Sequence, residues 1–478
     1  MRICIICEGC YPYVPGGVSS WIQMICNHFS DVEFVIWAIA TNRKEMSEYK
    51  YKVPDNVKDI STIYLGEEQF SHKYKKIYLS IDEKETLKNL VVGVVNEIDW
   101  EKTLKFMKKH KRYLTDILMS EDFYEICLEE YERQQSKKVF QHFLWNIRGM
   151  YFPLMHILSD DIPKADIYHC VSTGYAGILG SCASYIRKKP LLISEHGIYT
   201  REREEDIIRS NWVEGDFKEL WIEFFKKLSY IAYNQATNVT SLFEINKMLQ
   251  IELGCPEKKI CIIPNGINPE EFLNLKSYNK LNLNKFNIAA VLRVVPIKDV
   301  KTMILAFDIV REKMPEVKLS IMGNQEENPE YYEECRKMIE DLKIDDVEFL
   351  GQVNVKEYFP EIDLLLLSSI SEGQPLAILE GMAAGIPIVS TNVGDCKGLL
   401  EGEDGDNLGR AGIITPVMNS EAMAEAIIYC IKHPNERKRM GLVGQRRVDT
   451  YYRKDVFLKE YSKIYEKLGG DISGRYRI

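Results

Sequence analysis

The stretch Ser371-Glu-Gly-Gln-Pro-Leu-Ala-Ile-Leu-Glu-Gly-Met-Ala-Ala-Gly385 decides the fold of this chain. The apolar run Asp363–Ser368 precedes it and has the length of a buried strand. Pro375 opens a predicted helix at the position where a missing N–H costs nothing, and Gly385 ends that helix. The pattern is therefore strand, loop and helix, the unit from which parallel sheets are built.

The same alternation of strand and helix extends in both directions along the chain. In the second half, strands are predicted at Phe286–Leu292, Val317–Met322, Val347–Leu350, Asp363–Ser368 and Ile386–Ser390. In the first half they are predicted at Arg2–Cys7, Glu33–Ala40, Asp166–Val171, Leu191–Glu195, Asn238–Ser241 and Lys259–Ile263. Ligands of such α/β sheets bind beyond the carboxyl ends of the strands. The sequence thus predicts an α/β fold with two Rossmann-like parallel-sheet domains that face a cleft.

Domain boundaries follow from changes in composition. We expect an N-terminal domain over residues 1–273, a C-terminal domain over 274–452, and a final helix over 453–478 that packs back on the N-terminal domain. A helical insertion is predicted at about 66–160, where the chain is charged, aromatic and helical in period. Within the insertion, 102–112 is markedly basic, and a solvated helix face is a better interpretation than a membrane-surface patch.

Composition narrows the class of protein. The chain has 478 residues, 45% hydrophobic and 28% charged, which is typical of globular domains. Its net charge of −9 argues against a general nucleic-acid binder. No apolar stretch approaches the ~20 residues that span a bilayer, and the N-terminal MRICIICEG is interpreted as a strand, not as a signal peptide. We expect a cytoplasmic protein with free thiols, recruited to the inner face of a membrane only through partners.

Two glutamates follow the predicted strand Asp363–Ser368. Glu372 lies in the strand-to-helix loop, and Glu380 lies about a turn and a half into the helix. A carboxylate is suited to accept hydrogen bonds from the vicinal hydroxyls of a ribose or a hexose. Spacing alone leaves this hypothesis level with a capping Glu372 and a solvated Glu380.

Two other loops suit an anionic ligand. Arg293 and Lys298 follow the strand Asn287–Leu292, where fixed cations would stabilise a diphosphate whose charge grows as a bond breaks. Gly16 and Gly17 precede the first helix, where the backbone can approach a ligand and the helix N-terminus favours an anion. Exposed loop cations and a plain tight turn are the alternatives.

Two histidines end successive strands of the first half. His196 follows Leu191–Glu195 and precedes Gly197, and His169 ends the strand before it. A lone histidine is more often structural than catalytic, but two at neighbouring strand ends favour a site at the edge of the cleft.

Together these residues resemble glycosyltransferase family 4, retaining enzymes with the two-domain GT-B fold. The motifs that fall in the family's order are Glu372-x7-Glu380, the Arg293/Lys298 pair, Gly16-Gly17, His196-Gly197 and Ile263-Pro-Asn-Gly-Ile. A narrower similarity links the chain to the cytosolic transferases of Pel exopolysaccharide systems. It rests on Glu8-Gly-Cys-Tyr-Pro, Gly16-Gly-Val-Ser-Ser-Trp, His169-x-x-Ser-Thr-Gly-Tyr-Ala-Gly, Glu195-His-Gly-Ile-Tyr-Thr-Arg-Glu-Arg and Ser371-Glu-Gly-Gln-Pro.

The resemblance implies a retaining hexosyltransferase that moves a sugar from a UDP-sugar to a growing exopolysaccharide. UDP-glucose is the first donor to test, and no metal or other cofactor is expected. The implied partners are the UDP-sugar, a glycan acceptor and inner-membrane components of polysaccharide synthesis and export, with no nucleic acid. A GT-B nucleotide-sugar epimerase and a non-catalytic nucleotide-sugar-binding protein remain alternatives, and the acceptor, the linkage and the oligomeric state are not predicted.

The resemblance also implies a role for each residue. Arg293, Lys298, Glu372 and His196 would be catalytic, and Gly16, Gly17, Gly323, Val353, Gly373, Gln374, Leu376 and Glu380 would bind the nucleotide sugar. Glu380 would hold the ribose, the backbone near Val353 would meet the uracil, and Gly323 would let the chain pass close to the nucleotide. Gln374 and Leu292 depart from the family pattern, which more often has Phe and Gly at those positions.

Overall fold

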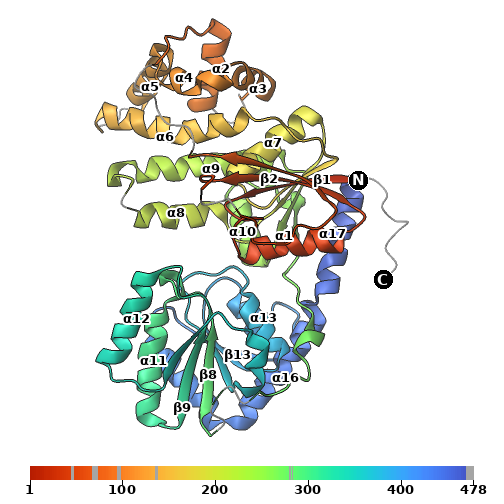
Figure 1. Cartoon of the computed structure of the whole chain (residues 1–478), viewed down its shortest axis with the longest axis vertical. Helices are drawn as coiled ribbons and strands as arrows, with labels where there is room; N and C mark the ends of the chain where they lie inside the picture. The colour runs from red at the N-terminus through yellow and green to blue at the C-terminus, as the bar shows by residue number, and fades with distance from the viewer. Residues whose placement is uncertain are drawn as a thin grey trace. The chain divides into compact units, whose positions relative to one another are not determined.

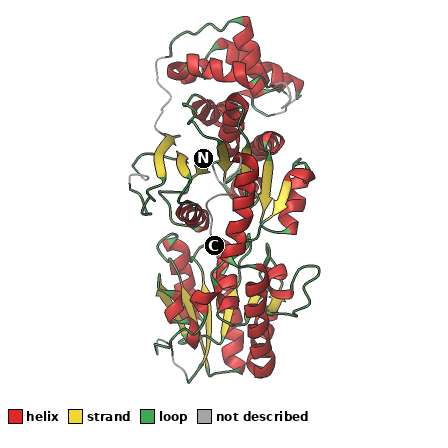
Figure 2. Cartoon of the chain, turned by 90° about the vertical axis from the view of Figure 1, so that its right-hand side faces the viewer, coloured by secondary structure: helices red, strands yellow, loops and turns green. Residues whose placement is uncertain are grey.

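The computed structural model describes residues 1–44, 48–66, 74–93, 98–134, 138–210, 212–278, 281 and 284–469. The chain forms two compact units, each built on its own sheet (Figure 1). The first unit comprises Met1–Ile262 and the described end of the chain from Tyr461, and the second comprises Ile263–Glu460. Helices flank the strands of both sheets (Figure 2). Across the described residues, none of the helices is both long enough and apolar enough to cross a membrane.

The first unit has a seven-stranded sheet in the order β3-β2-β1-β4-β5-β6-β7. Its strands are β1 (Arg2–Glu8), β2 (Glu33–Ala40), β3 (Val57–Tyr64), β4 (Ile167–Cys170), β5 (Leu191–Ser194), β6 (Asn238–Ser241) and β7 (Ile260–Ile262). Neighbouring strands pair in parallel, so their carboxyl ends share one edge. The middle of β1, Ile3–Cys7, is buried because strands and helices cover both faces of a parallel sheet.

Helices pack on both faces of this sheet. They are α1 (Gly17–His28), α7 (Tyr175–Arg187), α8 (Tyr199–Arg209), α9 (Lys218–Gln235) and α10 (Glu244–Glu252). The last helix, α17 (Lys454–Gly469), contributes Tyr461 and Tyr465 to the first unit, and both side chains are buried there.

Five further helices lie between β3 and β4: α2 (Ile81–Val91), α3 (Trp100–Lys109), α4 (Leu114–Leu118), α5 (Glu121–Arg133) and α6 (Phe140–Leu158). They carry the orange colours of Figure 1. Their apolar side chains continue the core of the sheet, because Trp100 and Met107 of α3 belong to the same buried cluster as Cys4 and Trp37. This segment is therefore part of the first unit and not a separate domain.

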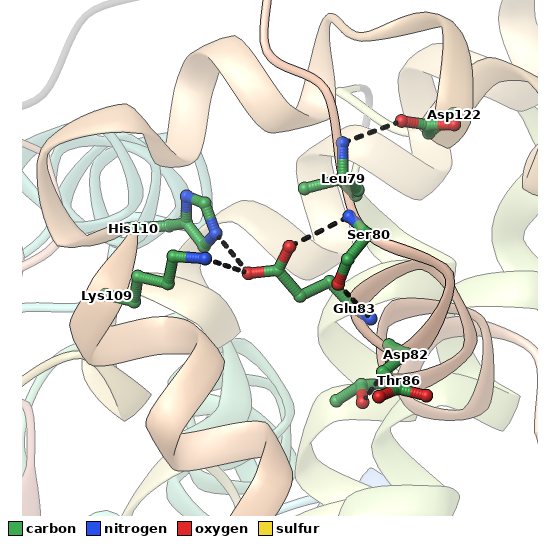
Figure 3. A network of polar contacts seen from close by, with 8 residues as sticks. All are labelled: Leu79, Ser80, Asp82, Glu83, Thr86, Lys109, His110 and Asp122. Atoms are coloured by element: carbon green, nitrogen blue, oxygen red, sulfur yellow. Dashed lines mark hydrogen bonds and ion pairs between the residues drawn. The ribbon is translucent and has the colours of Figure 1, made fainter.

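A carboxylate fastens α2 to α3 (Figure 3). Ser80 and Glu83 form a capping box at the start of α2. Glu83 also accepts hydrogen bonds from Lys109 Nζ and His110 Nε2, each at 2.8 Å. Burial would raise the pKa of Glu83, but the hydrogen bonds from Lys109, His110 and Ser80 outweigh it and lower the pKa to about 2. The Glu83 carboxylate therefore stays charged over the whole physiological pH range.

The second unit has a six-stranded parallel sheet in the order β10-β9-β8-β11-β12-β13. Its strands are β8 (Phe286–Val291), β9 (Val317–Met322), β10 (Val347–Gly351), β11 (Leu364–Leu367), β12 (Ile388–Thr391) and β13 (Gly412–Thr415). Its helices are α11 (Val300–Lys313), α12 (Pro329–Asp341), α13 (Leu376–Ala383), α14 (Cys396–Glu401), α15 (Ser420–Lys432) and α16 (Pro434–Tyr451). The prediction of two parallel-sheet α/β domains is thus confirmed.

The boundary between the units differs from the prediction. The first unit ends at Ile262, so residues 263–273 belong to the second unit instead of the first. Backbone hydrogen bonds explain this: Ile267 N–H donates to Tyr452 O at 2.9 Å, and Lys454 N–H donates to Ile267 O at 2.7 Å. The segment is thereby paired with the chain that follows α16.

Candidate functional site

Lys298 and Glu372 form an ion pair at the carboxyl edge of the second sheet. Lys298 Nζ lies 2.5 Å from Glu372 Oε1, and the two side chains are only 15% and 11% exposed. Ser369 Oγ donates to the same carboxylate oxygen at 2.6 Å. The contact arises because β8 and β11 are neighbours, so the loops that follow them lie side by side. The two residues predicted from separate motifs therefore belong to one site.

The loops that carry this pair are fastened to each other. Ser368 Oγ donates to Lys298 O at 2.8 Å, and Ile370 N–H donates to Ile297 O at 2.9 Å. Lys298 ends a short 3₁₀ turn, Pro296–Lys298, directly before α11. The ammonium group is therefore held in place before any ligand binds, as electrostatic catalysis requires.

Arg293 lies in the same loop as Lys298 but is more open. Its side chain is 56% exposed, and Nη1 lies 2.5 Å from Glu327 Oε1. An exposed pair of this kind contributes about 0–1 kcal/mol, so an anionic ligand can replace Glu327 at small cost. Arg293 and Lys298 thus differ: one cation is accessible and loosely paired, and the other is half-buried and fixed.

Glycine is required at position 323, where β9 ends. Its φ is +145°, and a Cβ there would lie 1.8 Å from the carbonyl oxygen of Leu292. Its N–H donates to Gly351 O at 2.8 Å. Glycine at 323 therefore lets β9 end against the backbone of the loop that carries Arg293. Val353, two residues beyond Gly351, is partly buried against the second unit's core.

Glu380 lies in α13, partly buried, and burial raises the pKa of its carboxyl. The positive charge of Lys356 opposes that rise. Lys356 Nζ forms an ion pair of 2.5 Å with Glu271. Sequence reasoning missed both Lys356 and Glu271, although Lys356 closely follows Gly351-Gln-Val. Leu376, at the first position of α13, is 38% exposed.

The side chain of Gln374 is turned into the second unit and is only 6% exposed. Its Oε1 accepts from Asn265 N–H and its Nε2 donates to Asp395 Oδ2, each at 2.6 Å. The carboxamide therefore joins the Ile263-Pro-Asn-Gly-Ile segment to this loop. Gly373, next to it, uses its carbonyl to accept from Asp395 N–H at 2.9 Å.

Burial raises the pKa of Asp395 to about 7, and the nearby Glu403 adds to the rise, while the hydrogen bond from Gln374 opposes it. This carboxyl therefore titrates close to neutral pH.

In the first unit, His196 follows β5 and its Nε2 is buried without a hydrogen-bond partner among the described residues. Its ring meets Trp21 edge-on, with centroids 4.8 Å apart. Burial lowers the pKa of His196 to about 4, so the imidazole is neutral at pH 7.

His169 is different, and the hypothesis of two functional histidines is wrong for it. Its Nδ1 is hydrogen-bonded to Tyr465 Oη at 2.9 Å, and its Nε2 is hydrogen-bonded to Ser194 Oγ at 2.8 Å. The residue is fully buried. Burial, together with the neighbouring His196, lowers the pKa of His169 to about 3. His169 is therefore a core residue that fastens α17 to the sheet.

More unsatisfied polar atoms lie near the carboxyl edge of this first sheet. Like His196 Nε2, the atoms Trp21 Nε1, Ser172 Oγ, Thr200 Oγ1 and Arg203 Nε are buried and have no hydrogen-bond partner among the described residues. Native proteins rarely leave such groups unsatisfied, so the cluster points to a polar ligand. Sequence reasoning singled out only His196, although Trp21, Thr200 and Arg203 lie in the quoted motifs.

Gly16 and Gly17 begin α1 and have open space where a Cβ would be. Gly16 N–H donates a hydrogen bond to Tyr51 Oη at 3.2 Å. Local packing therefore does not require glycine at either position. Among the described residues no group of three or more His, Cys, Asp or Glu could hold a metal ion.

Comparison with solved structures defines the class of fold. HepE of Anabaena, solved with UDP, is similar over 98% of this chain and 100% of its own, with a TM-score of 0.62 and 16% identity. HepE was also solved with UDP-glucose, with a TM-score of 0.60. The two parallel-sheet units thus form a GT-B fold.

The family follows from the sequence models. The chain belongs to the family described as a domain of unknown function, DUF3492, whose model matches residues 1–258, which is more than half of the chain. The model of glycosyl transferases group 1 matches residues 273–447, which carry the Lys298–Glu372 pair.

Two relatives match mainly one part of the chain. The amylovoran biosynthesis glycosyltransferase AmsK of Erwinia amylovora is 27% identical over 240 residues, 48% of this chain and 56% of AmsK. A trehalose synthase of Pyrococcus horikoshii is 29% identical over 248 residues, 48% of this chain and 57% of that enzyme. The chain thus matches a little over half the length of these relatives.

Proposed function

We propose that this chain is a retaining glycosyltransferase that moves a sugar from a UDP-sugar to a growing exopolysaccharide. The observation that carries the proposal is the half-buried Lys298–Glu372 pair at the carboxyl edge of the second sheet. It lies within the region that matches glycosyl transferases group 1. UDP-glucose is the first donor to test, since HepE, which has the same fold, was solved with it.

We assign a different role to each residue of the site around the Lys298–Glu372 pair. Arg293 and Lys298 bind the diphosphate and stabilise the charge that it gains as the bond to the sugar breaks. Glu372 accepts hydrogen bonds from sugar hydroxyls while it remains paired with Lys298. Glu380 binds the ribose, and the chain near Val353 binds the uracil. Gly16 and Gly17, at the start of α1 in the first unit, are proposed to bind the nucleotide sugar through the first N–H groups of that helix.

The proposed reaction keeps its atoms in balance. The bond between the anomeric carbon and the phosphate oxygen breaks, and UDP leaves with the electron pair. The acceptor hydroxyl oxygen bonds to the same face of that carbon, and its proton passes to the departing phosphate. Cations on the chain supply the positive charge, so we propose that neither a metal ion nor another cofactor is required.

The first unit is proposed to bind the glycan acceptor. His196, Trp21 and Thr200 each have a buried polar atom with no hydrogen-bond partner in the described part of the chain, and acceptor hydroxyls would satisfy these atoms. His196 is neutral at pH 7, so it contacts the sugar or acceptor as a hydrogen-bonding group and not as a cation.

The finer proposal is that the product is a Pel-type exopolysaccharide and that the chain acts as PelF does, a cytosolic transferase with inner-membrane partners. Its support is the set of motifs around Glu8, Gly16, His169, Glu195 and Ser371. AmsK, a relative, is itself named as a glycosyltransferase of amylovoran biosynthesis.

Thermal unfolding with a panel of nucleotides tests the donor class. UDP should raise the unfolding temperature more than ADP, GDP or dTDP, and a ligand at 100 times its Kd should add about 2.7 kcal/mol. The Lys298→Ala variant should weaken the stabilisation by UDP. The matched control is Lys318→Ala, which removes a lysine of β9 and should leave that stabilisation unchanged. Greater stabilisation by ADP or GDP would overturn the donor assignment.

A further inference from the structure

A broad groove lies at the amino edge of the first sheet, at the opposite end of the strands from His196. Its volume is about 1060 Å³. One wall is α3, which contributes Glu101, Lys105 and Lys108. The other is the turn between α7 and β5, which contributes Lys188 and Lys189. The helices α3 and α7 are in contact.

The groove is basic in a chain whose net charge is −9. Four lysines line it against one carboxylate, Glu101. Lys105 pairs with Glu101 at 2.7 Å, Lys108 with Asp161 at 3.3 Å, and Lys189 with Asp166 at 3.2 Å.

These lysines are free to change partners. Their side chains are 75%, 49% and 43% exposed, and exposed pairs contribute about 0–1 kcal/mol. Lys188 has no ion-pair partner within the described part of the chain and leaves the helix in a left-handed conformation, with φ of 52°. The groove therefore offers four ammonium groups to an anionic ligand.

Apolar residues line the groove together with the polar residues Ser184, Gln235 and Thr237. Leu104, Ile162, Ile186 and Pro190 line it, and Tyr185 is 46% exposed there. Lysines beside apolar residues fit a chain that carries both acidic and apolar side chains. The volume exceeds the ~300–1,000 Å³ of ordinary small-molecule pockets.

We propose that this groove docks an acidic peptide segment of a partner protein that also carries apolar side chains. A bilayer surface is flat and would meet a convex face, whereas this site is hollow. RNA is normally held by arginines and several stacked aromatic side chains, and the lining has one aromatic residue, Tyr185, and no arginine. The helical segment between β3 and β4 thereby gains a function, because α3 builds one wall.

Fluorescence anisotropy with the full chain tests this proposal. The probe is a labelled peptide of repeated Glu-Glu-Leu, and the matched probe is Gln-Gln-Leu. The acidic peptide should bind more tightly, and added salt should weaken it because the contacts are exposed. The double variant Lys105→Glu/Lys188→Glu should bind the acidic peptide about tenfold less tightly, as two lost charge contacts imply.

The control variant is Lys102→Glu, which changes an exposed lysine of the same helix that does not line the groove. It should bind the peptide within about twofold of the wild type. Equal binding of the two peptides by the wild type would overturn the proposal without any variant. Tighter binding of phosphatidylglycerol vesicles or single-stranded RNA, lost in the double variant, would replace the peptide with that partner.

Discussion

Replacing Lys298 by alanine tests the centre of the proposed site. Lys298 Nζ lies 2.5 Å from Glu372 Oε1, and both side chains are mostly buried. At an effective dielectric constant of about 20, their Coulomb attraction is roughly 4–7 kcal/mol, most of which desolvation offsets. Ser369 still donates to Glu372 in the variant, so we expect the free energy of unfolding to fall by about 1–3 kcal/mol and the fold to persist.

The catalytic loss should be larger than the loss of stability. Lys298 would face a phosphate whose charge grows in the transition state, and removing such a donor in other enzymes lowers kcat by roughly 10²–10³. Steady-state measurement of UDP release, with circular dichroism to confirm folding, gives both quantities. A folded Lys298→Ala with near-normal kcat would refute the placement of the site.

A double-mutant cycle separates catalysis from simple pairing. Glu372→Gln removes the carboxylate charge but keeps an oxygen for Ser369, and the double variant completes the cycle. We expect a coupling free energy of about 1–3 kcal/mol in urea unfolding. Absence of coupling would mean that the ion pair does not persist in solution.

Three further predictions concern binding, cofactors and pH. Glu380→Ala should mainly raise KM, because the ribose changes little in the reaction; a fall in kcat at constant KM would contradict that role. Activity should survive EDTA, and a loss that magnesium or manganese restores would disprove independence from metal. The pKa of Asp395 rises from 3.8 to about 7 on folding, so the folded state keeps a proton that the unfolded chain loses. The free energy of unfolding of the wild type should therefore fall by up to about 4 kcal/mol as pH rises from about 4 to about 7. The Asp395→Asn variant should not show that fall. If urea unfolding gives the same pH dependence for both proteins between pH 4 and 8, the prediction is wrong.

Strands with continuous apolar runs were predictable from sequence, and two others were not. Glu33–Ala40 was predicted with the bounds of β2, because parallel strands buried on both faces read as unbroken hydrophobic runs. Its neighbour β3, Val57–Tyr64, lies at the sheet edge and is largely half-exposed, with Lys58 and Asp59 within it. The last strand, β13, was missed: it has only four residues, and it forms the end of the sheet beside β12.

The site was predictable where it depends on sheet order and not where it depends on distant contacts. Lys298 and Glu372 follow strands that any parallel sheet of this kind places at one edge, so their motifs sufficed. The side-chain partners of Gln374, Asn265 and Asp395, were not predictable because they come from other parts of the chain. A polar residue in a loop motif looks the same whether its amide faces a ligand or the protein.

The two histidines of the first unit show what decides between structure and function. His169 and His196 both end strands and both are neutral at pH 7 because burial lowers their pKa. His169 has a protein partner on each nitrogen, and one of them, Tyr465, lies almost 300 residues away in sequence on α17. The Nε2 atom of His196 has no hydrogen-bond partner in the portion of the chain that the structure describes, although it is buried and the ring packs against Trp21. An unsatisfied buried polar group costs about 1–3 kcal/mol. A protein tolerates that cost most readily where a bound ligand supplies the missing hydrogen bond. We therefore propose that His196, and not His169, contacts the acceptor.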